Sequence, residues 1–506
     1  MGRVMNRACI SRRSFLVAAL CMPAIRTARA DCSNPALRIR VGRDFRTFDP
    51  ADAWGEDAII TRNLLAPLVR YMRKSSGDGW TWKRHIVESM SDDSPRRYQF
   101  KLREEAWRNT PNITTEDVAF SFERILGRAG GVSDALNKRA WSVLDTVEVV
   151  DPSSATVALR VDRPDFLTTV LPGVAGCVVN KAHVSTLAGG RFTLDPGPTS
   201  GRYDLCAVDP GVQARLVADR SWQGDKVEID SAAFIVITDD NTAKEMWLSR
   251  ELDVYRPGIG VLRQVVQQGQ SLVRTATSRT SILVLNQSAG ALANPELRRA
   301  VQLAVDRKAV GDFAYADGDP VVATGLIPRG WAGWSEKELT QYNPDEAQRL
   351  ATSIAPSEPL RIATSFDPLS LRIGEQVQRD LDKIGLRSDI LTKETASYWL
   401  AIAQNEADIL VTMTEPQTSG PLAPFGDFTS LSSLGWNRNA EFDAQYQRTD
   451  LEPTQDSLLN LQQLLTAQDI VVPLVEDQRA YLVSENVRPE FDPDGEVGDL
   501  GSWARV

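Results

Sequence analysis

The sequence predicts an α/β protein built from two or three packed units. The chain has 506 residues, of which 42% are hydrophobic and 25% charged, the composition of an ordinary globular protein. That length exceeds what a single hydrophobic core normally organises. In the C-terminal half, apolar strands alternate with amphipathic helices, a pattern typical of α/β units with parallel strand pairing.

The N-terminal half is richer in strands and irregular loops. Alternating apolar and polar side chains predict half-buried strands, and a turn signal at 151–154 predicts a hairpin. The predicted strands are 37–41, 98–102, 147–150, 156–161, 212–218 and 234–237. The predicted helices are 59–71, 118–126 and 241–248. Thr114 or Thr115 can cap the second helix, where the acids that follow favour its dipole.

The C-terminal half is more regular. The predicted strands are 282–285, 361–363, 388–391, 408–411, 471–475 and 480–483, and the predicted helices are 295–310, 369–384, 397–404 and 454–468. The change in character places a domain boundary near 270–282. A chain that crosses between units more than once forms a hinge rather than a simple tether.

The first 30 residues are predicted to be an export signal, outside the fold. A basic leader precedes an apolar run at 15–25, and Ala28-Arg29-Ala30 supplies a signal-peptidase site. The segment SRRSFL at 11–16 resembles the twin-arginine motif, with an ordinary secretory leader as the alternative. We therefore expect export to the periplasm by the twin-arginine route, which carries folded proteins.

Charge and hydropathy restrict the partners. The chain has 57 Lys and Arg against 67 Asp and Glu, and the leader contains six of the arginines and no acid, so the exported part is strongly acidic. An acidic protein repels phosphate backbones, so nucleic acid is not an expected partner. No segment after the leader offers about 18 consecutive apolar residues. We expect a soluble monomer.

Cysteines and histidines restrict the chemistry. Cys32, Cys177 and Cys206 follow the leader, and an oxidising compartment permits one disulfide. Cys177 with Cys206 is the plausible pair, and buried free thiols are the alternative. His85 and His183 are far apart and lack ligand-spaced neighbours, so we expect no metal, no cofactor and no histidine-based catalysis.

Seven short segments form an ordered set of motifs. They are FDP at 48–50, NLLAPLVRY at 63–71, YQFKLR at 98–103, TEDVAFSFE at 115–123, the run 286–310, YNPDEA at 342–347 and NAEFD at 439–443. In this order they resemble the extracellular solute-binding proteins of family 5, the peptide, nickel and opine class that serves ABC importers. Each motif alone is weak, but seven in sequence across 38–483 are specific.

The resemblance implies a two-lobed Venus-flytrap fold with an extra subdomain in lobe I. It implies lobe I at 31–278 with that subdomain at about 75–195, lobe II at 279–469, and a return to lobe I at 470–506. The ligand would bind in the cleft, and closure would shift the population from open to closed forms. The expected partners are a small organic solute (peptide-like, opine-like or a sugar conjugate) and an ABC permease.

Two departures from the family pattern bear on the ligand. Peptide-binding members place an Asp four residues before the Pro of an acid-Pro pair, where it meets the ligand's ammonium; before Glu415-Pro416 this chain has Thr412. A buried ammonium without a partner is costly. In the family's GTGPY loop Arg202 replaces Pro, and it either holds a carboxylate or phosphate or is an exposed surface residue. A polar or anionic solute is therefore expected.

The predicted ligand-binding residues combine aromatic and polar side chains. Aromatic rings suit a cleft because they bury a large area with few rotatable bonds. The predicted set is Trp54, Arg202, Arg279, Trp399, Thr412, Thr414 and Trp436. Packing in the core is the alternative for each tryptophan.

Two other functions compete with transport. The same fold could serve a periplasmic chaperone or sensor that engages a protein. A carboxylate-based hydrolase is the second alternative, but no carboxylate pair is singled out and no G-x-S-x-G motif occurs. We expect a binding protein and not an enzyme.

Overall fold

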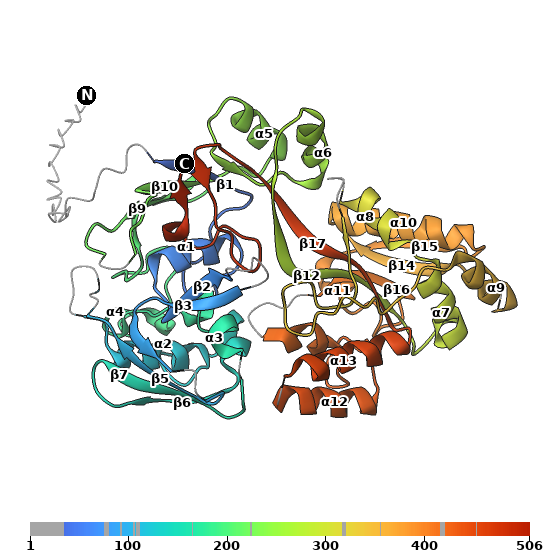
Figure 1. Ribbon diagram of the computed structural model, residues 1–506, viewed down its shortest axis with the longest axis horizontal. Coiled ribbons are helices and arrows are strands. Elements are labelled where there is room, and N and C mark those ends of the chain that lie inside the picture. Colours follow the sequence, from blue (N-terminus) through green and yellow to red (C-terminus); the bar gives the residue numbers. More distant parts are fainter. Residues whose placement is uncertain are drawn as a thin grey trace, which may run out of the picture.

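The computed structural model describes residues 35–506 except 75–79, 92–93, 105–106, 108–111, 164, 223–224, 316–319, 355, 415–419 and 452. The predicted export signal and the Glu415-Pro416 pair lie outside the described residues. Two lobes lie side by side, and two long strands, β12 (Val273–Leu285) and β17 (Val471–Val483), pass between them (Figure 1).

Strands β12 and β17 form an antiparallel ribbon that both lobes share. The ladder pairs Arg274 with Ala480 at one end and Val284 with Val471 at the other, with a register shift between Ala276 and Thr280. The ribbon lies inside an 11-stranded sheet of the described residues, in the order β15-β14-β16-β12-β17-β11-β1-β10-β9-β8, with β13 paired to β17. The predicted boundary at 270–282 thus falls within one continuous strand.

Lobe I is built around the N-terminal strand. β1 (Leu37–Val41) has alternating burial and pairs in parallel with β10. Its other strands are β2 (Val69–Arg73), β3 (Trp80–Arg84), β8 (Tyr203–Asp209), β9 (Gln213–Ala218), β10 (Ser231–Val236), β11 (Val254–Tyr255), β18 (Val487–Arg488) and β19 (Ala504–Arg505). Its helices are α1 (Glu56–Leu64), α5 (Asp240–Leu248), α6 (Ile259–Gln267) and the 3-10 turn η6 (Leu500–Ser502).

A four-stranded antiparallel sheet lies within the subdomain predicted at about 75–195. Its strands are β4 (Val87–Met90), β5 (Arg97–Leu102), β7 (Ser154–Leu159) and β6 (Leu144–Val149), in that order. The β6–β7 pairing confirms the hairpin predicted at 151–154. Its helical elements are α2 (Thr115–Ile125), α3 (Phe166–Thr169), α4 (Lys181–Val184), η1 (Leu136–Trp141), η2 (Val174–Gly176) and η3 (Ala188–Gly190).

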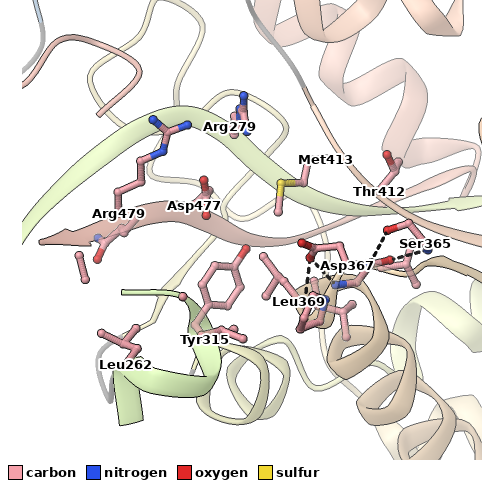
Figure 2. A pocket seen from close by; sticks show the side chains of 18 of the residues that line it. Leu262, Arg279, Tyr315, Ser365, Asp367, Leu369, Thr412, Met413, Asp477 and Arg479 are labelled. Carbon is pink, nitrogen blue, oxygen red and sulfur yellow. Dashed lines mark hydrogen bonds between the residues drawn. The ribbon is translucent and has the colours of Figure 1, made fainter. Parts of the chain in front are cut away.

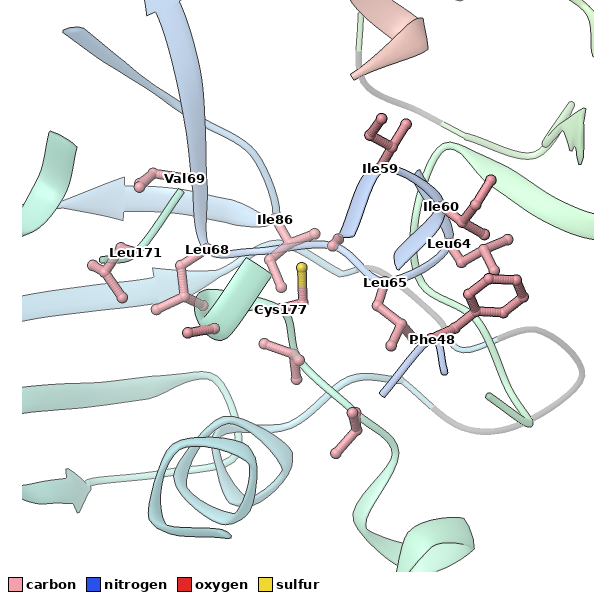
Figure 3. Packing of buried hydrophobic residues seen from close by; sticks show 14 of the residues in the cluster. Phe48, Ile59, Ile60, Leu64, Leu65, Leu68, Val69, Ile86, Leu171 and Cys177 are labelled. Atoms are coloured by element: carbon pink, nitrogen blue, oxygen red, sulfur yellow. The ribbon is translucent and has the colours of Figure 1, made fainter. Parts of the chain in front are cut away.

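The subdomain shares one hydrophobic cluster with the rest of lobe I. Phe48 and Leu64 lie in the same cluster as Ile86, Leu171 and Cys177 (Figure 3). The core of lobe I is therefore continuous across the two sheets.

Lobe II is a doubly covered α/β unit. Its strands are β13 (Val321–Val322), β14 (Leu360–Ser365), β15 (Ser388–Lys393) and β16 (Ile409–Met413), and β14 pairs in parallel with β15 and β16. Its helices are α7 (Pro295–Ala304), α8 (Arg307–Ala314), α9 (Pro344–Ile354), α10 (Pro368–Lys383), α11 (Thr395–Tyr398), α12 (Ala440–Leu451) and α13 (Gln455–Ala467), with the 3-10 turns η4 (Ala291–Ala293) and η5 (Gly420–Phe428). Separate apolar clusters cover the two faces of the sheet.

Three predicted elements have different bounds in the structure. The helix predicted at 59–71 ends at Leu64, because its last residues belong to β2. The helix predicted at 295–310 is two helices, since Asp306 caps the second by accepting from the Ala309 amide. The strands predicted at 471–475 and 480–483 are one strand, β17.

The disulfide predicted between Cys177 and Cys206 is wrong. Cys177 is a buried free thiol, packed in the lobe I core, whereas Cys206 belongs to a disulfide. The free thiol at Cys177 matches the alternative for that residue. In the part of the chain that the structure describes, no helix has the length and apolar character needed to cross a membrane, and no cluster of three metal-ligand side chains occurs.

Candidate functional site

A cavity of about 510 Å³ lies against the ribbon (Figure 2). Its walls come from the start of α6, the ribbon, the residue after α8, the start of α10, α11 and β16. We call it the ribbon cavity; its lining includes Ile259, Arg279, Tyr315, Leu369, Trp399, Thr412 and Arg479. Because both lobes supply walls, a molecule in this cavity would contact both.

The ribbon side of the cavity is charged. Arg256, Arg279, Asp477 and Arg479 line it, and Glu496 stands behind them. Glu496 pairs with Arg479 and accepts from Arg256 Nη1 at 3.3 Å. Opposite charges at these distances are strongly coupled when they are shielded from water.

The two acids of this cluster respond differently to their surroundings. Burial raises the pKa of Asp477, although Arg479 and Arg279 act in the opposite direction. Burial also acts to raise the pKa of Glu496, but Arg479, Arg256 and Arg279 outweigh it and hold that pKa below its ordinary value. Glu496 is therefore the more firmly ionised of the two.

The lobe II side of the cavity is largely uncharged. Val411, Thr412 and Met413 of β16 form one wall together with Trp399. The Tyr398 hydroxyl donates to the Val411 carbonyl. The side chain of Thr412 is only 4% exposed, and its Oγ1 has no hydrogen-bond partner among the described residues.

Asp367 stands where α10 begins. Its Oδ1 accepts from the amides of Leu369 and Ser370 at 2.8 and 3.3 Å, and Pro368 occupies the first helical position. This arrangement is a strong helix start, since the carboxylate meets the positive end of the helix dipole. It also fixes the edge of the cavity next to β16.

Three of the seven predicted ligand-binding residues line the ribbon cavity: Arg279, Trp399 and Thr412. Trp54 does not; it is 42% exposed in lobe I, with the guanidinium of Arg43 at 4.7 Å from its ring centroid. Trp436 stacks behind Trp399, with ring centroids 6.2 Å apart. Thr414, 4% exposed, accepts from the Thr280 amide at 2.9 Å and packs between strands.

Arg202 is neither at the ribbon cavity nor on the surface. Its side chain is 3% exposed inside lobe I, which contradicts the alternative that it is a surface residue. It pairs with Asp499 at 3.3 Å and with Asp225 at 3.5 Å. This residue ties the loop before β8 to the C-terminal segment.

Sequence reasoning missed Arg256, Tyr315, Asp367, Asp477 and Arg479. A signal existed for two of them, because Asp477 and Arg479 interrupt an apolar strand with charge. The others lie at element ends that only the tertiary structure brings to one cavity.

Comparisons with known proteins agree with this architecture. A sequence model of the family described as bacterial extracellular solute-binding proteins, family 5, middle part, matches residues 81–435. The chain is 22% identical to the peptide transport periplasmic protein SapA of Salmonella typhimurium over 447 residues, which cover 82% of this chain and 80% of that protein. It is 22% identical to the dipeptide-binding protein of Escherichia coli over 338 residues, 61% of this chain and 62% of that one.

Solved structures share the fold. The ABC transporter substrate-binding protein CtaP of Listeria monocytogenes superposes with a TM-score of 0.79 at 18% identity, over 93% of this chain and 99% of that chain. The dipeptide-binding protein of a Pseudoalteromonas species, in complex with Met-Leu, superposes with a TM-score of 0.74 at 18% identity, over 93% of this chain and all of that chain. Both are two-lobed, as this chain is.

Proposed function

This chain belongs to the bacterial extracellular solute-binding proteins of family 5, and on that premise we propose that it captures a small organic solute in the ribbon cavity and delivers it to an ABC importer. The solute is peptide-like, opine-like or a sugar conjugate. SapA and the dipeptide-binding proteins among its relatives are named for peptide transport and peptide binding.

The position and size of the ribbon cavity carry this proposal. Its volume of about 510 Å³ lies in the usual range for small-molecule sites. One wall comes from α6 in lobe I and the opposite wall from α10 and β16 in lobe II, on either side of the ribbon that joins the lobes. A ligand that touches both walls favours the closed arrangement, and an importer can read that difference in free energy.

We further propose that residues 1–30 direct export to the periplasm by the twin-arginine route, where the chain works as a monomer and binds its solute without transforming it. The SRRSFL segment supports the route. Replacement of both Arg12 and Arg13 by Lys should retain the protein in the cytoplasm, as fractionation would reveal. Periplasmic recovery of that variant would instead indicate the ordinary secretory route.

Native mass spectrometry of the protein purified from the periplasm tests the receptor function. We expect a small molecule in the bound mass, released unchanged on denaturation. The variant Arg479→Gln should lose it, whereas Arg128→Gln, on the far side of lobe I, should retain it. A protein that carries no small molecule and gains no thermal stability with any member of a broad solute panel would contradict the proposal; 100-fold excess over Kd should add about 2.7 kcal/mol of stability.

A further inference from the structure

An unsatisfied hydroxyl faces the ribbon cavity at the end of β16. Thr412 Oγ1 is buried and has no hydrogen-bond partner among the described residues, although the side chain lines a volume of about 510 Å³. A buried hydroxyl without a partner costs free energy that a ligand group can recover. Thr414, two residues along the same strand and equally buried, is satisfied by Thr280.

The surroundings of Thr412 do not suit a positive charge. Its strand neighbours in the wall, Val411 and Met413, are apolar, and Trp399 is the aromatic residue beside them. Two described carboxylates line the cavity, and both are engaged: Asp367 caps α10, and Asp477 faces the arginines and accepts from Thr277. An ammonium placed at Thr412 would lose its water without gaining a carboxylate of its own.

The opposite end of the cavity suits an acidic group. Arg256 and Arg479 share a single carboxylate, Glu496, through one nitrogen of each. A guanidinium has five N–H donors in a planar fork, so each of these arginines can also bond a ligand oxygen anion. Arg279 and Arg479 point into this end of the cavity in Figure 2.

We propose that the ribbon cavity selects solutes that carry an acidic group for the ribbon arginines and an uncharged hydrogen-bonding group, in place of an ammonium, at Thr412. This inference rests on the proposed receptor function and narrows its ligand class to acidic solutes whose amine is absent or acylated. Thr412 is then the residue that sets specificity against free amines, by leaving such ligands with an unpaired charge.

A matched pair of ligands isolates the amine. Ala-Glu and N-acetyl-Ala-Glu carry the same carboxylates and differ at the amino end alone. By calorimetry at pH 7 we expect the wild type to bind N-acetyl-Ala-Glu at least about tenfold more tightly, as expected for a buried polar group left unpaired. Thr412→Asp should reverse that preference, and Thr412→Val should weaken the acetylated ligand about two- to tenfold.

Two further variants serve as controls. Thr414→Val makes the same change at an equally buried site outside the cavity, so the ratio of the two affinities should not change. Asp367→Asn keeps a helix-capping side chain while removing the charge, and it too should leave the ratio unchanged. A selective loss of Ala-Glu binding in Asp367→Asn would place an ammonium site there and overturn the inference.

The remaining outcomes also decide the question. Equal or tighter binding of Ala-Glu by the wild type overturns the inference, and so does failure of both ligands to bind. In that last case a small solute retained in native mass spectrometry would still support the receptor function, so the two proposals fail separately. If Thr412→Asp does not fold, the Thr412→Val and Thr414→Val comparison still tests the role of the hydroxyl.

Discussion

The FDP motif owes its place in lobe I to a buried ion pair. Asp49 and Arg124, which are both almost fully buried, form a salt bridge between the loop after β1 and helix α2. Asp49 also accepts from the Ala51 amide at 2.9 Å, and Arg124 Nε donates to the Gly190 carbonyl at 2.8 Å. Two motifs far apart in the sequence are thus one interaction in the fold.

Removing one partner of this pair should be severely destabilising. Arg124→Met leaves the Asp49 carboxylate buried without its counter-ion, which costs about 3–5 kcal/mol. Urea unfolding monitored by circular dichroism would measure it. Arg128→Met, which removes an exposed arginine that donates to the Asp145 carbonyl at 2.6 Å, should cost less than about 1 kcal/mol. Equal effects of the two substitutions would contradict the assignment.

His85 should make stability depend on pH. It is buried against the ring of Trp222, near Arg202, Arg70 and Asp499, and burial together with Arg202 lowers its pKa to about 3. Because the folded pKa is below the unfolded value, the unfolded state takes up the proton first. Stability is therefore fully present above about pH 6.5 and is lost as pH falls toward 3.

The variant His85→Phe isolates this contribution, since the other titrating groups are unchanged. Between pH 7 and pH 4 the wild type should lose more unfolding free energy than the variant, by on the order of 3 kcal/mol. Parallel urea titrations at several pH values measure the difference. Superimposable pH profiles would show that His85 is not buried in the neutral form.

At the scale of elements, helix starts are fixed by local side chains. The hydroxyl of Thr114 and the carboxylate of Asp117 form a capping box at the start of α2, and Asp117 also accepts from the Lys181 amide at 2.9 Å. The cap therefore joins α2 to α4 as well as starting α2. Thr114 and α10's Asp367 belong to the same class of local signal.

Loss of this cap should have a moderate cost. Thr114→Ala should destabilise the protein by about 1 kcal/mol, because two amide groups lose their partners. Thr352→Ala, at an exposed position inside α9, provides a control with an expected change near zero. Chemical unfolding of both variants measures the difference, and a neutral Thr114→Ala would mean that the box is dispensable.

At the scale of the whole molecule, the lobes also touch away from the ribbon. Arg139 of η1 hydrogen-bonds the hydroxyl of Tyr446 on α12, and its guanidinium lies over Gly426 of η5. Lobe I therefore contacts lobe II at the side of the molecule where the subdomain faces α12. This contact favours the closed arrangement of the lobes.

Arg139→Ala should open the ligand-free protein. One hydrogen bond of about 1 kcal/mol changes an open–closed ratio about fivefold. Small-angle scattering should give a larger radius of gyration for the variant, while Arg128→Ala, which lacks a contact with lobe II, should match the wild type. An unchanged radius for Arg139→Ala would indicate that the ribbon alone sets the arrangement.

Local pattern was sufficient where one element decides its own structure. The alternation in β1 and β5 and the capped, amphipathic α10 were predicted to within one residue. It was insufficient where neighbours decide: the apolar stretch 64–69 fits a helix as well as a strand, and pairing with β3 makes its end part of β2. The charges of β17 were read as a break between two strands, whereas they face the cavity.

The sequence by itself determined the α/β class, the ordered motifs of the family and three side chains of the ribbon cavity: Arg279, Trp399 and Thr412. Periodicity, caps and motif order are local in the chain, so they can be read from it. Only the tertiary structure decided that Cys177 is free, that Arg202 is buried by Asp499 from the far end of the chain, and that Arg256 meets Arg479 at Glu496. These contacts join residues hundreds of positions apart, and their burial and charge pairing exist only once the lobes are folded.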